Sequence, residues 1–425
     1  MMLADLGLSP AWSDVTPNAI VCRFCGSHNL TEVLDLGAQP PSNSFVSEDR
    51  LLEPEPHYAL IVLHCCKCGL FQVPASASAR EIFSDYVYFS SYAESWLAHA
   101  RRYVDAVAER FHLGPQSLVV EIASNDGYLL QYVTARGIPA FGIEPAGNVA
   151  QAAQRKGVET LVDFFTLDLA KRLARQGKRA DLIIGNNVLA HVPPLNDFVA
   201  GLQHLLKPDG VITMEFPHLV HLIEQLQFDT IYHEHYSYYS LIVAEKIFVA
   251  HGLRIFDVET LPTHGGSLRI YACHADAGHQ QMRSVERLRQ AEIQRGFDRP
   301  DVYLDFGQKV YALKRDLLDF FIAKKREGHR IAGYGAAAKG NTLLNFLGLR
   351  SDFIDFVVDR NPAKQGKYLP GSHIPVLAPD VIEQRRPDFL VILPWNLRDE
   401  IAGQMEAIRG WGGQFVTLIP NVTVF

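Results

Sequence analysis

Apolar residues fall into short runs between residues 115 and 217, and these runs alternate with stretches of helical spacing. The runs include LVVEI, AFGI, DLIIG and VITMEF. Several end in small or polar residues before the next helix-like stretch begins. Short apolar strands that alternate with helices are typical of a parallel, doubly wound sheet. We therefore expect an α/β domain in the centre of the chain, preceded by an amphipathic helix over 93–113.

The flanking regions show two other patterns. Residues 1–75 are rich in loops and proline, with two strand-like runs, EVLDLG and YALIVLHC, so this segment needs an additional cross-link to hold a core. After helix-like stretches over 282–328, strand–turn–helix patterns resume with RIAGYGAAAKGNTLLNFLGL. We expect a small domain over 14–75, a Rossmann-like domain over 76–280 and a second Rossmann-like domain over 281–425.

Composition, net charge and the lengths of the apolar runs exclude several classes of protein. Of the 425 residues, 48% are hydrophobic and 20% charged, as in ordinary globular proteins, and a net charge of -7 argues against a nucleic-acid partner. No apolar run reaches the length of a membrane span, and MMLADLGLSPAWSDVT lacks the basic and apolar regions of a signal peptide. The sequence predicts a cytoplasmic protein without a membrane partner, acting as a monomer or a homodimer.

Five of the six cysteines lie between residues 22 and 68, and four of them form two CxxC pairs. The first pair is Cys22 and Cys25, and the second is Cys65 and Cys68. Two such pairs supply the four thiolates of a tetrahedral zinc site, and four-cysteine sites are usually structural. His64 and Cys66 lie beside the second pair and are competing ligands, and free thiols are the alternative to a metal.

The run LVVEIASNDG at 118–127 predicts a strand that enters a turn of small residues before a helix. The turn departs from GxGxxG, which disfavours a dinucleotide pyrophosphate and favours S-adenosylmethionine (SAM), a cofactor without phosphate. NAD and a mononucleotide are the alternatives. Glu144 ends the next strand, where a carboxylate can bind ribose hydroxyls. The candidate cofactor-binding residues are Glu121, Ala123, Asn125, Asp126, Gly127, Glu144, Pro145, Asp163, Phe164, Asn186 and Asn187.

A cluster of ionisable and aromatic residues, FDTIYHEHYSYYS, spans 228–240. Tyr232, Glu234 and His235 are candidates for proton transfer, because histidine titrates near neutral pH and a carboxylate can orient it. A polar surface loop is the alternative interpretation. Tyr86 and Tyr88 are candidates to close over the cofactor, or else to pack a domain interface.

The C-terminal region adds a turn of small residues with Lys339, followed by a strand that ends in Asp359. A helix N-terminus and a lysine form an anion site, which suits a nucleotide diphosphate. A degenerate domain that only packs is the alternative. The candidate substrate-binding residues are His191, His264, Ser267, Arg269, Tyr334, Lys339, Asn341, Asp359 and Lys364.

Taken together, these motifs resemble the SAM-dependent C-methyltransferases of nucleotide-linked deoxysugar biosynthesis. The resemblance rests on the paired cysteines, on EIASNDG in place of the family's EIGSNDG, on the YHEH run and on GYGAAAKGNTLLN at 333–345. It covers nearly the whole chain. It implies a class I methyltransferase Rossmann-like domain, an N-terminal zinc domain with four cysteine ligands and a second C-terminal Rossmann-like domain.

The resemblance also implies a reaction. The substrate is a dTDP-linked or similar nucleotide-linked 4-keto-6-deoxysugar. His235 removes a proton from the carbon beside the ketone, Tyr232 and Glu234 orient this base or stabilise the enolate, and the carbon then takes the methyl group of SAM. The zinc is structural. The rival hypotheses are a zinc-domain methyltransferase that acts on RNA or protein, and a dehydrogenase-like or non-enzymatic sugar-nucleotide protein.

Overall fold

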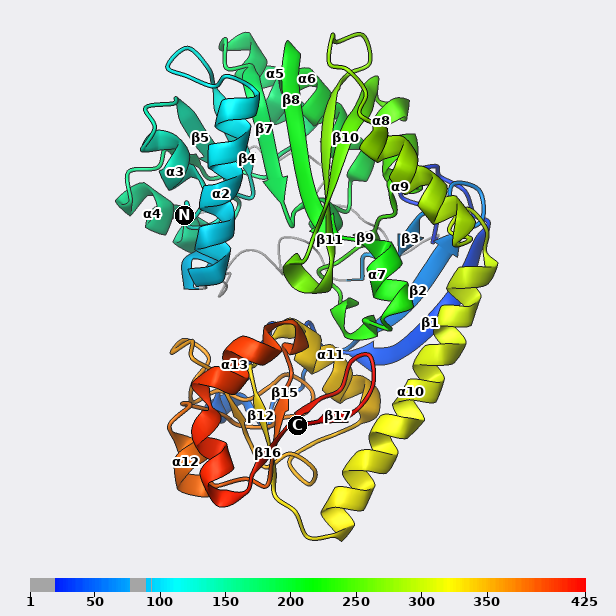
Figure 1. Ribbon diagram of the computed structural model, residues 1–425, viewed down its shortest axis with the longest axis vertical. Helices are drawn as coiled ribbons and strands as arrows, with labels where there is room; N and C mark the ends of the chain where they lie inside the picture. The colour runs from blue at the N-terminus through cyan, green and yellow to red at the C-terminus, as the bar shows by residue number, and fades with distance from the viewer. Residues whose placement is uncertain (1–19, 77–88, 93) are drawn as a thin grey trace.

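A computed structural model describes residues 20–76, 89–92 and 94–425. Figure 1 shows them as two lobes, one above the other, with the long helix α10 (Asp301–Arg326) running along one side. Each lobe contains a sheet, and a third sheet reaches from one lobe toward the other. No helix among the described residues is both long enough and apolar enough to span a membrane.

The upper lobe is built on a seven-stranded sheet of order β10-β11-β8-β7-β4-β5-β6. Five strands are parallel: β4 (Val119–Ile122), β5 (Ala140–Ile143), β6 (Thr160–Leu161), β7 (Ala180–Asn186) and β8 (Leu206–Pro217). They confirm the predicted doubly wound sheet. The antiparallel hairpin of β10 (Leu253–Leu261) and β11 (Ser267–His274) extends the sheet beside β8 and was not predicted as part of it.

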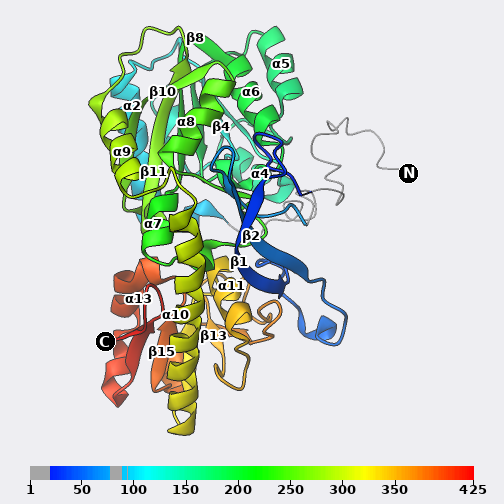
Figure 2. The same cartoon turned by 90° about the vertical axis from the view of Figure 1, so that its right-hand side faces the viewer.

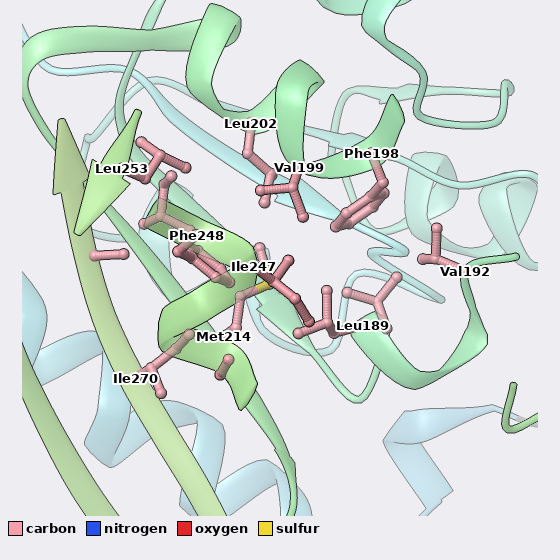
Figure 3. Close-up of a cluster of buried hydrophobic side chains, with 14 of the residues drawn as sticks. Leu189, Val192, Phe198, Val199, Leu202, Met214, Ile247, Phe248, Leu253 and Ile270 are labelled. Atoms are coloured by element: carbon pink, nitrogen blue, oxygen red, sulfur yellow. The ribbon is translucent and has the colours of Figure 1, made fainter. Parts of the chain in front are cut away.

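Helices connect and cover these strands. They are α2 (Glu94–Arg110), α3 (Leu130–Thr134), α4 (Gly147–Arg155), α5 (Leu167–Arg175), α6 (Leu195–Leu205), α7 (Leu219–Glu224), α8 (Leu241–Ala250) and α9 (Arg283–Gln294). α2 confirms the predicted amphipathic helix. Figure 3 shows the apolar layer in which Val199 of α6 and Phe248 of α8 pack near Met214 of β8. This buried layer supports one face of the sheet, and the carboxyl ends of its parallel strands remain available for a ligand.

The N-terminal sheet contains β1 (Leu30–Gln39), β2 (Tyr58–Cys65), β3 (Phe71–Gln72) and β9 (Ser237–Tyr238), all antiparallel. The last strand comes from the His/Tyr cluster, far away in the sequence. Phe71 pairs with Tyr238 and Gln72 with Ser237. The segment that follows His235 is therefore a strand of the N-terminal sheet.

The lower lobe holds a six-stranded sheet of order β14-β13-β12-β15-β16-β17. Its strands are β12 (Ile331–Tyr334), β13 (Val357–Val358), β14 (Val376–Leu377), β15 (Phe389–Ile392), β16 (Gln414–Thr417) and the antiparallel β17 (Thr423–Val424). Its helices are α11 (Ala338–Leu347), α12 (Val381–Arg385) and α13 (Arg398–Gln404). This is the expected second Rossmann-like sheet, while the limits 14–75, 76–280 and 281–425 stay predictions.

Helix α10 joins the lobes and packs against the N-terminal sheet. In the turned view of Figure 2, β1 and β2 lie beside α10 and α11. α10 approaches β1 closely at Gly307, where a methyl group would lie 2.0 Å from the Val33 carbonyl oxygen. Tyr303, Phe306 and Val310 are buried around this point. Only glycine lets the helix and the strand approach so closely.

We predict that Gly307→Ala lowers stability by roughly 1–3 kcal/mol, because the added methyl group must push the α10 backbone away from β1. Thermal unfolding measures the effect. Gly403→Ala is the matched control, since Gly403 is also helical and has no heavy atom near its Cβ position within 4 Å. Equal melting temperatures for Gly307→Ala and the wild type would show that α10 does not depend on this contact.

Candidate active site

One cavity of about 830 Å³ brings together residues from every part of the chain. A volume of this size suits small-molecule ligands. Asn43 reaches it from the connection between β1 and β2, and Lys339 from the lower lobe. The predicted residues on its wall are Ala123, Asn125, Glu144, Pro145, Phe164, Asn186, Asn187, His191, Tyr232, Glu234, His235, His264, Lys339 and Lys364. Tyr86 and Tyr88 lie outside the described residues.

The turn after β4 forms one end of the cavity. Its backbone is left-handed at Ala123, Asn125 and Gly127, with φ of 54°, 47° and 74°. Such angles are uncommon except for glycine and, to a lesser degree, asparagine, so the turn is tightly constrained. Asn125 N–H donates to Glu144 Oε2 at 3.0 Å, which fixes the turn against the end of β5. The small side chains let a ligand approach the backbone closely.

Two buried carboxyl groups lie behind and beside this turn. Burial raises the pKa of Glu144 to about 7, even though its oxygens accept hydrogen bonds from the amides of Ala146 and Asn125. Burial also raises the pKa of Glu121 well above its usual range, and the Tyr128 hydroxyl offsets part of that rise. Among the described residues, no hydrogen bond of regular geometry reaches either Glu121 oxygen. Glu144 is on the cavity wall, where its carboxyl group suits a ligand that brings hydrogen-bond donors, whereas Glu121 does not line the cavity.

Of the remaining candidates for cofactor binding, some lie on the cavity wall and others do not. Asn186 Nδ2 lies 3.4 Å from the Tyr128 hydroxyl, and Asn187 Nδ2 donates to His264 Nε2 at 2.9 Å, both on the cavity wall. Asp126 lies behind the wall and pairs with Lys156 at 3.0 Å. Asp163 pairs with Arg172 at 3.0 Å and does not line the cavity, whereas its neighbour Phe164 does.

His235 is oriented by two hydrogen bonds. Its Nδ1 lies 2.9 Å from the Thr230 carbonyl oxygen, which only accepts, so Nδ1 carries the proton. Nε2 therefore holds a lone pair and lies 2.8 Å from the Tyr232 hydroxyl. Burial, reinforced by the neighbouring His191, lowers the pKa of His235 well below its usual range. The imidazole is thus neutral at pH 7, as a proton acceptor must be.

Glu234 does not orient His235 in this structure. Instead its Oε1 accepts a hydrogen bond from Asn43 Nδ2 at 2.6 Å. Lys364 is the nearby cation: the negative charge of Glu234 partly offsets the lowering of the Lys364 pKa that burial causes. Glu234 is therefore held between the N-terminal connection and the lower lobe, on the cavity wall.

The lower lobe contributes two half-buried lysines to the cavity. Lys339 donates to Asn396 Oδ1 at 2.7 Å and lies 4.3 Å from the centre of the Trp395 ring. Lys364 donates to the Ala336 carbonyl at 2.8 Å and lies 3.6 Å from Asp359. Burial lowers the pKa of both lysines. Two cations in a partly closed cavity favour an anionic ligand.

Four other candidate substrate-binding residues form hydrogen bonds within the protein instead. Asp359 accepts from the backbone amides of Ala336 and Asn361, each at 2.8 Å, so it stabilises its own turn. Asn341 Nδ2 donates to the Ser42 carbonyl at 2.6 Å, and the Tyr334 hydroxyl donates to Gln404 at 3.1 Å. Ser267 donates to the Thr263 carbonyl at 2.9 Å. None of the four lines the cavity.

The Arg269 side chain also does not line the cavity. It forms ion pairs with Glu215 at 2.6 Å and with Glu259 at 2.9 Å. Because both carboxylates already occupy its guanidinium, the expectation that Arg269 faces a substrate anion is not supported by its placement. The sequence did not point to Glu215, which lies in a strand that reads as apolar.

The structure adds cavity residues that the sequence analysis missed. The most notable are Asn43, Trp96, His99, Thr230 and Asn396. Trp96 and His99 lie on α2, where their spacing resembles an ordinary amphipathic face. Asn43 follows Pro40 and Pro41 in a loop without a motif. A local signal was absent for Asn43 and His99, since their partners come from distant segments, whereas Thr230 lies within the cluster at 228–240 and binds His235.

The four predicted zinc ligands lie together. The sulfurs of Cys22 and Cys68 are 3.4 Å apart, those of Cys25 and Cys65 are 3.6 Å apart, and all four ligand atoms lie within 4.8 Å of one another. Zn–S bonds of about 2.3 Å place tetrahedral sulfurs about 3.8 Å apart, so the cluster fits a zinc ion.

The two competing ligands lie outside this cluster. His64 stacks on Tyr303 with ring centres 4.2 Å apart, and Cys66 is exposed beside the Thr31 hydroxyl. The four-cysteine assignment is therefore the one that the geometry supports.

Three family models match successive parts of the chain. Their descriptions are "Putative zinc binding domain" for residues 22–83, "Methyltransferase domain" for 95–258 and "C-methyltransferase C-terminal domain" for 262–420. The first model contains all four clustered cysteines. The second spans the turn after β4, and the third spans the lower lobe.

The chain is also similar to individual proteins. C-methyltransferase NovU of Streptomyces niveus is 35% identical over 406 residues, which cover 95% of this chain and 96% of that protein. Ubiquinone biosynthesis O-methyltransferase of Chelativorans sp. (strain BNC1) is 24% identical over 116 residues, covering 25% and 46%. A solved SAM-dependent methyltransferase from Clostridium acetobutylicum has a TM-score of 0.35 and 12% identity, covering 42% of this chain and 92% of that one.

We predict one zinc ion per chain and its loss in Cys65→Ser, because the variant lacks one of the four thiolates. Elemental analysis of protein purified without chelators measures the metal. Cys66→Ser is the matched control, since Cys66 is adjacent but lies outside the cluster. Zinc-free wild-type protein, or loss of zinc from Cys66→Ser, would contradict the assignment.

Proposed function

The chain belongs to the SAM-dependent C-methyltransferase family, and we propose that it methylates a carbon next to the keto group of a dTDP-linked or other nucleotide-linked 4-keto-6-deoxysugar. The observation that carries the proposal is that one cavity contains both the turn after β4 and the neutral imidazole of His235. A cofactor turn and a proton acceptor in one cavity are what carbon methylation requires. The resemblance noted from the sequence motifs supplies the substrate class.

SAM supplies a methyl group that its positively charged sulfur makes electrophilic. The constrained backbone at Ala123 and Asn125 would lie against the cofactor, and Glu144 would accept hydrogen bonds from its ribose hydroxyls. Each Glu144 oxygen accepts one backbone amide and keeps a further lone pair for that purpose. Pro145 and Phe164, both on the cavity wall, would enclose the adenine.

His235 acts as the general base in this proposal. A ketone acidifies the adjacent C–H bond, and a neutral histidine whose position is fixed can accept that proton at Nε2. The hydrogen bond from Nδ1 to Thr230 fixes this tautomer. The Tyr232 hydroxyl, 2.8 Å from Nε2, positions the imidazole and is close enough to share the proton.

The two cavity lysines suit the diphosphate of a nucleotide-linked substrate. Lys339 and Lys364 line the end of the cavity nearest the lower lobe, together with Ala337 and Ala338 at the N-terminus of α11. Backbone amides at a helix N-terminus and lysine ammonium groups both favour a phosphate. Glu234, held by Asn43, would then accept a hydrogen bond from the sugar that extends toward His235.

The proposal is tested by incubating the enzyme with SAM and a panel of nucleotide-linked 4-keto-deoxysugars. Mass spectrometry is expected to find a product heavier by one methylene unit for at least one sugar. An enzyme that binds SAM, methylates no member of the panel and instead methylates RNA or protein would contradict the proposal. That outcome would support the rival hypothesis from the sequence, a methyltransferase that acts on RNA or protein.

We predict that His235→Ala retains SAM affinity within about twofold and loses methyl transfer by about 100-fold or more, because general-base catalysis contributes at least that much. Calorimetry measures SAM binding, and initial rates measure turnover. His28→Ala is the control, since His28 is exposed and distant in sequence from the His/Tyr cluster at 228–240. Unchanged turnover in His235→Ala would remove this residue from the role of base.

A further inference from the structure

Arg23 lies inside the first CxxC pair, between Cys22 and Cys25, and its side chain reaches the N-terminal sheet. Its backbone amide donates to Gln72 Oε1 at 3.1 Å, and its Nε donates to the same oxygen at 3.2 Å. Its Nη2 donates to the Val73 carbonyl. Gln72 is the last residue of β3, and Val73 follows it. One side chain therefore joins the first cysteine pair to this strand.

The same guanidinium contacts the segment that carries the proposed base. Its central carbon lies 5.4 Å from the centre of the Tyr236 ring, and a guanidinium within about 6 Å of an aromatic face is attracted to it. Tyr236 is fully buried and directly follows His235. The Val73 amide also donates to the Tyr236 carbonyl at 3.0 Å. Arg23 thus contacts both sides of the pairing between β3 and the segment after His235.

Both ends of this connection are attached to the methyltransferase lobe. Next to Arg23, the Phe24 carbonyl accepts a hydrogen bond from Asn196 of α6 at 2.9 Å. At the other end, the Tyr236 amide donates to the Ala190 carbonyl at 2.8 Å. Because the cysteine pair is attached to the lobe, the Arg23 side chain can hold β3 and Tyr236 in a fixed position relative to it.

The shape of the guanidinium suits these contacts. Its nitrogens lie in one plane, so Nε and Nη2 can donate to two oxygens while the face of the group lies over a ring. A lysine ammonium has no such face and ends in a single nitrogen. Replacement of Arg23 by lysine therefore keeps the charge but not the full set of contacts to Gln72, Val73 and Tyr236.

We propose that Arg23 is a positioning residue for methyl transfer, and that it holds the base His235 in place by joining the first cysteine pair to β3 and Tyr236. The inference rests on the proposed function. Arg23 does not line the cavity, so it acts on the reaction through the position of His235. Proton removal requires Nε2 at the correct distance from the carbon, and a displacement of about 1 Å can lower the rate about 100-fold.

Arg23→Met tests this role, because methionine keeps an apolar side chain of similar length and has no donor. We expect kcat per SAM site to fall roughly 10- to 100-fold, while the KM for the ketosugar and the SAM Kd each change less than about twofold. Calorimetry counts the SAM sites, so unfolded protein does not lower the rate per site. Elemental analysis is expected to find one zinc ion per chain, since the four cysteines remain.

Hydrogen exchange followed by mass spectrometry tests the contact without any sugar substrate. We expect the peptide that covers 229–240 to exchange faster in Arg23→Met than in the wild type, because its attachment to the cysteine pair is lost. The peptide that covers the turn at 123–127 is expected to exchange at the wild-type rate. An unchanged rate for 229–240 would overturn the inference.

Arg254→Met is the matched control. Arg254 is also half-buried and donates to backbone carbonyls, including those of Ala275 at 3.2 Å and Ala277 at 2.7 Å. It lies on β10 and does not line the cavity. We expect wild-type kcat per SAM site for this variant. Arg23→Lys is the conservative variant, and we expect it to recover part of the rate that Arg23→Met loses, because it keeps the charge and a donor.

The inference and the proposed function fail in different ways. Wild-type kcat per SAM site in Arg23→Met would overturn the inference, as would loss of zinc from that variant, since Arg23 would then serve the metal site. A wild-type enzyme that methylates no ketosugar contradicts the proposed function, and the role of Arg23 in catalysis falls with it.

Discussion

The pairing of β9 with β3 is the contact on which the geometry of the active site depends. Phe71 and Gln72 pair with Tyr238 and Ser237, and the Val73 amide donates to the Tyr236 carbonyl at 3.0 Å. β3 begins three residues after the last zinc ligand of the chain, Cys68. The zinc cluster therefore fixes one strand, and that strand fixes the backbone immediately after the candidate base. This arrangement gives a structural metal site an influence on catalysis although the cysteines do not line the cavity.

The same segment is held from the other side by the lower lobe. Thr342 Oγ1 on α11 donates to the Ile231 carbonyl at 3.0 Å, and Trp395 Nε1 donates to Asp229 Oδ2 at 2.8 Å. Asn43 binds Glu234 from the N-terminal connection. Residues 229–235 are thus fixed by all three parts of the chain. A histidine and a tyrosine with the proposed catalytic roles need such support, because small displacements are costly in catalysis.

The sequence predicted the features of the fold and the site that arise from residues near one another along the chain. The CxxC pairs indicated a four-cysteine site, the turn at 123–127 indicated the cofactor end of a doubly wound sheet, and the alternation of strands and helices indicated two α/β sheets. These features depend on residues close together in sequence. The pairing of β9 with β3 joins segments more than 160 residues apart, and no periodicity in two-residue strands could reveal it.

Sequence reasoning missed or misplaced some side chains because their partners lie on other elements of the fold. Arg269 lies next to the glycine turn at 265–266, which suggested an anion site, but its two carboxylate partners come from β8 and β10. His99 looked like part of an amphipathic helix because Glu215 is 116 residues away.

In the proposed reaction, methyl transfer depends on removal of a proton from a carbon beside the ketone. The first experiment uses a substrate that carries deuterium at both carbons beside the ketone, with the product analysed by mass spectrometry. We expect the methylated product to lack one of these deuterium atoms and the label to slow the chemical step. A methylated product that retains every deuterium would rule out this route, because the methyl group would then have gone to an oxygen or a nitrogen.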